Sequence, residues 1–153
     1  MSTMRPTPYS AFNYLVNLGD NTEGDVQGGF SEVSGLGMEI TVAEYRNGNA
    51  PVNYVTKIPS VNKSGDVTLK RGVIGAANLY AWIEQIRNGD VLAKRNVTIK
   101  LKNEDPTSQT AVVTWKLINA MPIKWTGPTL AAKGGTDVAM EELVLAVEHI
   151  EQA

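Results

Sequence analysis

The amino-acid sequence predicts a mainly β protein, a single β-barrel or sandwich of antiparallel strands with one amphipathic helix and a long hairpin arm. Apolar and polar residues alternate through several short segments, which is typical of half-buried strands. Turn-forming pairs such as Asn47-Gly48 and Gly134-Gly135 separate these segments. With 153 residues, of which 42% are apolar and 20% charged, the chain can bury a core as one domain over residues 1–153.

The first part of the chain is expected to form two short strands and a long hairpin. The two strands are predicted at Phe12–Leu18 and Gly29–Ser34. Met38–Tyr45 alternates between apolar and polar residues, and Asn47-Gly48 tolerates the positive φ values of a type I′ hairpin turn. With a returning strand over Val52–Ile58, the pattern predicts an arm over residues 38–58.

The middle of the chain contains two strictly alternating strands, Asp66–Arg71 and Asn96–Lys102. Their valine, isoleucine and leucine side chains are expected to face a core, because strand residues point alternately to opposite faces. The residues expected on the polar faces are Thr68, Lys70, Thr98, Lys100 and Lys102. Two further strands, Ala111–Asn119 and Val138–Glu148, complete the predicted sheet.

The segment Gly75–Asn88 has a helical rather than a strand period. Apolar residues recur there about every 3.6 residues. They are Ala76, Leu79, Trp82, Ile83 and Ile86. Because Gly89 follows as a helix stop, one amphipathic helix is predicted over about residues 76–88, docked on the sheet.

Charge and composition argue against several function classes. The net charge of −2 and the lack of a Lys/Arg run disfavour nucleic acid as the main partner. The absence of cysteine excludes disulfides, thiol nucleophiles and thiolate metal sites. No signal peptide is evident, and no segment reaches the roughly 20 apolar residues needed to span a bilayer. We therefore expect no membrane anchor and assembly in the cytoplasm of the producing cell.

No set of residues predicts catalysis, cofactor binding or a metal site. His149 is the single histidine and is expected to be exposed near a mobile chain end. Glu141 and Glu142 would point to opposite faces of a strand, at its solvated end. The acidic segment Asp20–Asp25 does not fit a calcium loop. The sequence therefore predicts no catalytic, cofactor-binding or metal residue, no cofactor, and no enzyme activity.

Two interpretations of the hairpin remain open from the residues alone. A hairpin this long can be an arm that lies on an adjacent subunit, or it can be only a mobile loop. A different class of protein is also compatible with the aromatic content, namely a monomeric barrel that binds a small ligand or single-stranded nucleic acid. Trp82 and Trp115 favour core packing instead, because each shares a face with apolar neighbours.

Several blocks together resemble the tail tube proteins of contractile phages and extracellular contractile injection systems. The match covers nearly the whole chain, and the order of the blocks carries it. The blocks are Phe30–Leu36 (FSEVSGL), Glu44–Gly48 (EYRNG), Val67–Val73 (VTLKRGV), Trp115–Trp125 (WKLINAMPIKW) and Ala139–Glu148 (AMEELVLAVE). One departure is Ser60, which stands where the family usually has glycine.

The resemblance implies a structural subunit of an inner tube, built from stacked hexameric rings with a hollow lumen for cargo. Its implied partners are other copies of itself, a contractile sheath protein, baseplate hub or initiator tube proteins, and cargo or genome in the lumen. A tube-initiator or adaptor paralogue at the baseplate is the alternative within the family. The subunit would end in a phage tail or an extracellular particle.

The resemblance also favours the arm interpretation of the hairpin. The residues expected to contact a neighbouring subunit are Glu44, Tyr45, Arg46, Asn47, Gly48, Asn49, Ala50, Pro51, Val52, Asn53 and Tyr54. The sheet edges and the N-terminal segment are further expected ring contacts.

Overall fold

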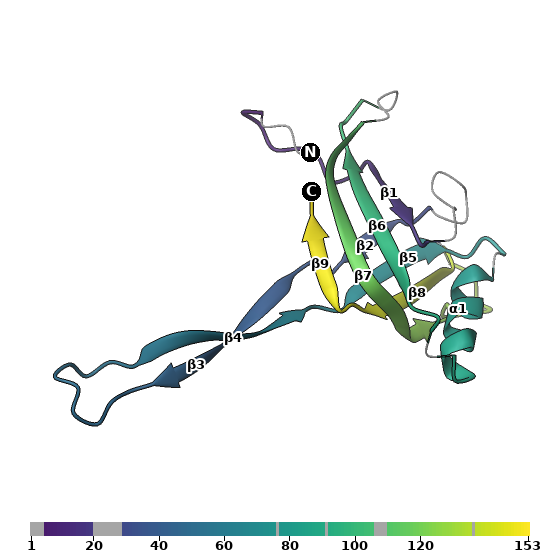
Figure 1. The fold of residues 1–153 in the computed structure, drawn as a ribbon. Helices are drawn as coiled ribbons and strands as arrows, with labels where there is room; N and C mark the ends of the chain where they lie inside the picture. The colour runs from purple at the N-terminus through teal and green to yellow at the C-terminus, as the bar shows by residue number, and fades with distance from the viewer. Residues whose placement is uncertain (1–4, 20–28, 76, 91, 106–109, 136) are drawn as a thin grey trace.

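The computed structural model describes residues 5–19, 29–75, 77–90, 92–105, 110–135 and 137–153. The acidic segment Asp20–Asp25 lies outside the described residues. Within the described ranges, nine strands and one helix follow one another along the chain (Figure 1). They are β1 (Tyr14–Asn17), β2 (Glu32–Ser34), β3 (Met38–Tyr45), β4 (Thr56–Ser64), β5 (Val67–Gly72), α1 (Asn78–Arg87), β6 (Arg95–Lys102), β7 (Ala111–Thr126), β8 (Met140–Ala146) and β9 (His149–Gln152).

Seven of these strands form one antiparallel sheet in the order β1-β6-β7-β8-β5-β2, with β9 paired to β7. The long strand β7 belongs to both halves of the sheet, because its first part pairs with β6 and β9 and its last part with β8. Among the described residues, β1 and β2 do not pair with each other, so the sheet is open rather than a closed barrel. The predicted mainly β fold with antiparallel strands and one helix is confirmed.

The core lies between the two halves of the sheet. One cluster of buried side chains joins β1, β6, β7 and β9 to β5 and β8, and includes Leu79 and Trp82 of the helix. Helix α1 packs on β7, and the Trp82 indole donates a hydrogen bond of 2.8 Å to the Ala93 carbonyl. The core role predicted for Trp82 is therefore confirmed, and Trp115 packs against the same cluster.

Strand β5 follows the predicted alternation, since its buried and half-buried residues strictly alternate. Strand β6 does so only up to Lys100, because Leu101 is also half-buried, and the register with β7 shifts between Leu101 and Lys102. Because of this irregularity Lys102 is buried, and its prediction as an outward-facing residue is wrong. A register shift is set by the partner strand, so the sequence of β6 alone does not reveal it.

A sharp corner in β7 separates the two halves of the sheet. Asn119 has a φ of 52°, the single positive value among the described non-glycine residues. Its backbone N–H donates to the Asn96 side-chain oxygen at 3.1 Å, and its side-chain amide donates to Glu148 at 2.7 Å. Lys94 donates to the other oxygen of Glu148 at 2.9 Å. The hydrogen bond from Lys94, and after it the one from Asn119, lowers the pKa of Glu148. The Glu148 carboxylate is therefore charged while it holds the corner.

Candidate assembly surface

Strands β3 and β4 form a separate two-stranded ribbon that projects away from the rest of the fold (Figure 1). Every residue of both strands is exposed except the half-buried Ser64. The ribbon nevertheless carries large apolar side chains, with Met38 63% and Val61 68% exposed. Its exposed apolar residues also include Ile40, Val42, Tyr45 and Ile58. Contiguous exposed apolar surface is typical of sites that contact another molecule.

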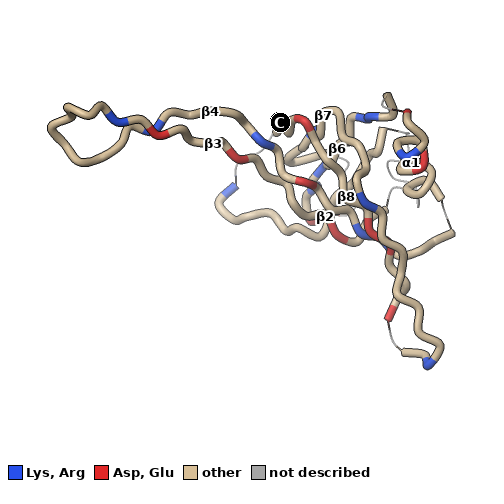
Figure 2. Tube along the Cα trace, turned by 90° about the horizontal axis from the view of Figure 1, so that it is seen from below, with Lys and Arg blue, Asp and Glu red and all other residues tan. Residues whose placement is uncertain are grey.

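Opposite charges face each other across the ribbon. Glu39 is the direct partner of Lys63, and Glu44 is the direct partner of Lys57. Figure 2 shows the resulting mixture of acidic and basic positions along the ribbon. Each such cross-strand pair contributes roughly 0.2–1 kcal/mol to pairing. A two-stranded ribbon is only marginally stable alone, so contacts with other surfaces would add to its stability.

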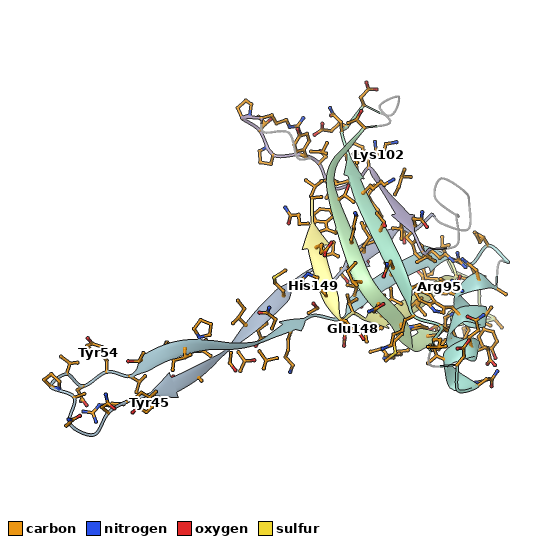
Figure 3. All side chains as sticks on the ribbon, viewed as in Figure 1. Tyr45, Tyr54, Arg95, Lys102, Glu148 and His149 are labelled. Carbon is orange, nitrogen blue, oxygen red and sulfur yellow. The ribbon has the colours of Figure 1, made fainter. Side chains whose placement is uncertain are left out.

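The predicted contact residues Glu44–Tyr54 lie at the far end of the ribbon, where Figure 3 labels Tyr45 and Tyr54. The Tyr45 hydroxyl donates a hydrogen bond of 2.6 Å to the Asn47 side-chain oxygen. All of the side chains from Glu44 to Tyr54 are exposed except the half-buried Ala50. Tyr54 reaches 70% exposure. The structure thus places the predicted residues together on one projecting tip.

The turn at this tip differs from the predicted type I′ hairpin. The Ala50 N–H bonds to the Asn47 carbonyl at 3.1 Å, which makes Gly48 and Asn49 the central residues of the turn. Neither Asn47 nor Gly48 has a positive φ, so the type I′ geometry is absent. The second strand begins at Thr56 and ends at Ser64 instead of covering Val52–Ile58. The hairpin is therefore longer than predicted and has a wide loop between Tyr45 and Thr56.

The N-terminal segment, expected from the resemblance to contact neighbours, is clamped onto the end of β6. The Arg5 guanidinium donates to both oxygens of Glu104, at 2.5 and 2.9 Å, and stacks 3.8 Å above the Tyr9 ring. The Ser10 N–H adds a third hydrogen bond to the same carboxylate at 3.1 Å. These hydrogen bonds, that of Arg5 first, lower the pKa of Glu104 to about 2.

A buried ion pair lies where β5, β8 and the start of α1 meet. Arg71 is 1% exposed and Glu141 is 6% exposed, and their Nε and Oε1 atoms are 2.6 Å apart. Arg71 also donates to the Asn78 side-chain oxygen at 2.5 Å. Glu141 and Glu142 do point to opposite sides of β8, but the expected solvated strand end is wrong for Glu141. The strand periodicity shows that Glu141 shares a face with Leu143, but it does not reveal the arginine partner.

The described part of the chain contains no group of three or more histidine, cysteine or carboxylate side chains able to hold a metal ion. His149 starts strand β9 opposite Ile118 and is exposed, near Glu148 at the corner (Figure 3). Its predicted place in a mobile end is wrong, because β9 is a paired strand. None of the helices in the described ranges has both the length and the apolar character to cross a membrane.

Residues 10–151 match the family model described as "T4-like virus tail tube protein gp19". No curated protein sequence matches this chain. A chain in the cryo-EM structure of an extracellular contractile injection system, the PVC sheath-tube complex in its extended state, is 30% identical with a TM-score of 0.82. That alignment covers 97% of this chain and 93% of the other.

Two further solved structures contain chains of similar shape and sequence. The tube-terminating cap of the anti-feeding prophage includes a chain with 27% identity and a TM-score of 0.82, covering 100% of this chain and 95% of that chain. The anti-feeding prophage baseplate includes one with 27% identity and a TM-score of 0.78, covering 97% of each chain.

Proposed function

This chain belongs to the family of T4-like virus tail tube proteins, and we propose that it builds the inner tube of a contractile injection system or phage tail. In this proposal the subunits close into hexameric rings, and the rings stack around a hollow lumen. The observation that carries it is the β3–β4 ribbon, which exposes apolar side chains along nearly its whole length. We propose that the tip residues Glu44–Tyr54 contact a neighbouring subunit.

The proposed assembly needs two kinds of interface. A ring closes through a head-to-tail contact repeated around the axis, and stacking requires a second contact that stays open-ended. The task of such a subunit is to transmit force and confine cargo, so it needs stiffness and contact area rather than a reactive group. The two halves of the sheet pack on each other, and the hydrogen bonds of Asn119 hold the corner between them, which gives the subunit that stiffness.

The partners follow from the same proposal. The similar chains come from structures of a sheath-tube complex, a tube-terminating cap and a baseplate. For this chain we propose a contractile sheath protein and baseplate hub or initiator proteins as neighbours, with cargo or genome inside the lumen. Assembly would take place in the cytoplasm of the producing cell, before the tube becomes part of a phage tail or extracellular particle.

A loop replacement tests the role of the tip. Because Tyr45 and Thr56 are direct cross-strand partners, Asn-Gly can replace residues 46–55 and close a two-residue hairpin. The shortened protein should keep the circular dichroism and unfolding midpoint of the unassembled wild type, since the loop is outside the core. Negative-stain microscopy should show rings or tubes for the wild type and none for the variant. Normal rings from the variant would refute the contact role of the tip.

Similarity to a baseplate chain motivates a second candidate within the family, an initiator or adaptor subunit that forms one ring at the baseplate. Stacking distinguishes the two, because a main tube protein extends into tubes and an adaptor stops at rings. A monomeric ligand-binding barrel is disfavoured. A groove beside the start of β8, lined by polar residues such as Asp137 and Glu142 as well as apolar ones, is open rather than enclosed, and Trp82 and Trp115 pack in or against the core.

A further inference from the structure

The sequence Arg-Asn-Gly occurs twice in this chain, at residues 46–48 and at residues 87–89. An asparagine followed by glycine is especially prone to spontaneous deamidation, because the glycine nitrogen can attack the side-chain amide without a side chain of its own in the way. Both asparagines and both glycines are exposed, and a Cβ placed on either glycine would meet nothing within 4 Å. Access to solvent therefore does not distinguish the two sites.

The backbone nitrogen of the glycine does distinguish them. The Gly89 N–H donates to the Ile86 carbonyl at 3.1 Å, in the turn that ends helix α1. This nitrogen can attack only after the hydrogen bond breaks and the helix end opens. Gly48 is a central residue of the tip turn, and its N–H bonds to none of the residues that the structure describes. The attacking nitrogen is therefore free at the tip of the ribbon and held at the end of the helix.

A hydroxyl group at the tip assists the same reaction. The Tyr45 hydroxyl donates a hydrogen bond of 2.6 Å to the Asn47 Oδ1 atom. This oxygen belongs to the carbon that the Gly48 nitrogen would attack, and negative charge develops on it as the new bond forms. A donor placed on such an oxygen stabilises the developing charge, as the donors of an oxyanion hole do. The tip thus combines a free attacking nitrogen with a polarised amide.

We infer that Asn47 is a self-modification site, deamidated selectively in the folded, unassembled chain. The Gly48 nitrogen bonds to the Asn47 Cγ atom, and the bond from Cγ to the side-chain nitrogen breaks. The proton of the Gly48 nitrogen ends on the departing ammonia, and a five-membered imide remains. Water then opens the imide, giving aspartate when it attacks Cγ and isoaspartate when it attacks the backbone carbonyl carbon. Either product carries a new carboxylate at the tip.

Peptide mapping by mass spectrometry measures the reaction on dilute, unassembled wild-type protein incubated at neutral pH. Trypsin cleaves after Arg46 and Arg87, so each asparagine begins its own peptide. Water labelled with oxygen-18 during the incubation is incorporated into the product and marks the change as earlier than the digestion.

The two sites are compared in the folded and in the unfolded chain. In the folded protein Asn47 should react about tenfold faster than Asn88, because only Asn88 requires a backbone hydrogen bond to break first. In concentrated urea the two rates should agree within about twofold, because the local sequence is the same and the folded turn is lost. Equal rates in the folded protein, or a difference that persists in urea, would overturn the inference.

Tyrosine-to-phenylalanine variants test the hydroxyl donor. Tyr45→Phe keeps the ring and removes the hydroxyl that bonds to Asn47, so deamidation should slow by about threefold. Tyr54→Phe makes the same change at the other tyrosine of the tip and is the matched control, whose rate should equal that of the wild type. Both side chains are exposed and outside the core, so both variants keep the fold. An unchanged rate in Tyr45→Phe would overturn the role of the hydroxyl.

The consequence for assembly, unlike the chemistry, rests on the proposed function. A carboxylate at a packed tip must lose its water, which costs free energy unless the neighbour supplies a partner. In a partly aged sample, the deamidated fraction should therefore be about threefold higher in unassembled chains than in sedimented tubes. Equal fractions would overturn this consequence. A wild type that never assembles would overturn it together with the proposed function, while the rates at Asn47 and Asn88 are measured without assembly.

Discussion

Removing the carboxylate of Glu141 should be the most damaging single charge change in the described part of this protein. Arg71 and Glu141 are 1% and 6% exposed, and their ion pair of 2.6 Å links β5 to β8. Glu141→Ala leaves the arginine charge buried without its carboxylate, and breaking such a pair costs about 3–5 kcal/mol. Because Asn78 still accepts a hydrogen bond from Arg71, we expect the lower part of that range.

Urea unfolding of the unassembled protein, followed by circular dichroism, measures this loss. The matched control is Glu142→Ala, which removes a carboxylate from the next residue of β8, on the opposite face. It should change the unfolding free energy by less than about 1 kcal/mol, as is typical of partly exposed charges. A loss below about 1 kcal/mol for Glu141→Ala would refute the reasoning.

The double variant Arg71→Met with Glu141→Leu separates the loss of the pair from the burial of an unpaired charge. Apolar residues of similar volume often replace a buried ion pair without loss, or with a gain of about 1–4 kcal/mol. We therefore expect the double variant to be at least as stable as the wild type. A double variant as unstable as Glu141→Ala would mean that packing, not the unpaired arginine, explains the loss.

Three further predictions concern the sheet corner, the N-terminal clamp and the base of the ribbon. Asn119→Val should lower the free energy of unfolding by about 1–3 kcal/mol in thermal unfolding, because a β-branched residue disfavours positive φ. Asn119→Gly should lower it by less. Because the folded pKa of Glu104 is lowered to about 2, its stabilisation is fully present above its ordinary pKa and is lost as pH falls through about 2. Glu104→Gln should flatten that part of an acid unfolding curve, and an unchanged curve would contradict the assignment. Gly35→Ala should destabilise strongly in thermal unfolding, because a Cβ there meets a backbone carbonyl oxygen at 2.1 Å, while Gly37→Ala meets nothing within 4 Å and should be tolerated.

The strand periodicity was sufficient to predict much of the fold, because burial alternates wherever one face of a strand packs on a core. It located β3 and β5 within one residue at each end, and the helical period found the buried Trp82. The short strand β9 was not predicted, because four residues with a single apolar side chain, Ile150, give too little periodicity. Its pairing with β7 comes from the fold, not from its own sequence.

Features that depend on pairing between distant residues could not be predicted from the sequence. Arg71 and Glu141 are cross-strand partners although they lie far apart in the chain, so nothing near Glu141 reveals its arginine partner. Lys102 departs from the alternation because of a register shift that β7 imposes. The projecting hairpin, in contrast, was visible in the alternation of Met38–Tyr45 and its turn residues.

Native mass spectrometry of the wild-type protein across a concentration series, with electron microscopy of the same samples, tests the proposed assembly most directly. The proposal predicts a species of about 99 kDa, six copies of the 16.5 kDa chain, that appears as six-fold rings and then as stacked tubes. A protein that stays at 16.5 kDa at every concentration, or that forms only two-fold dimers, would contradict it.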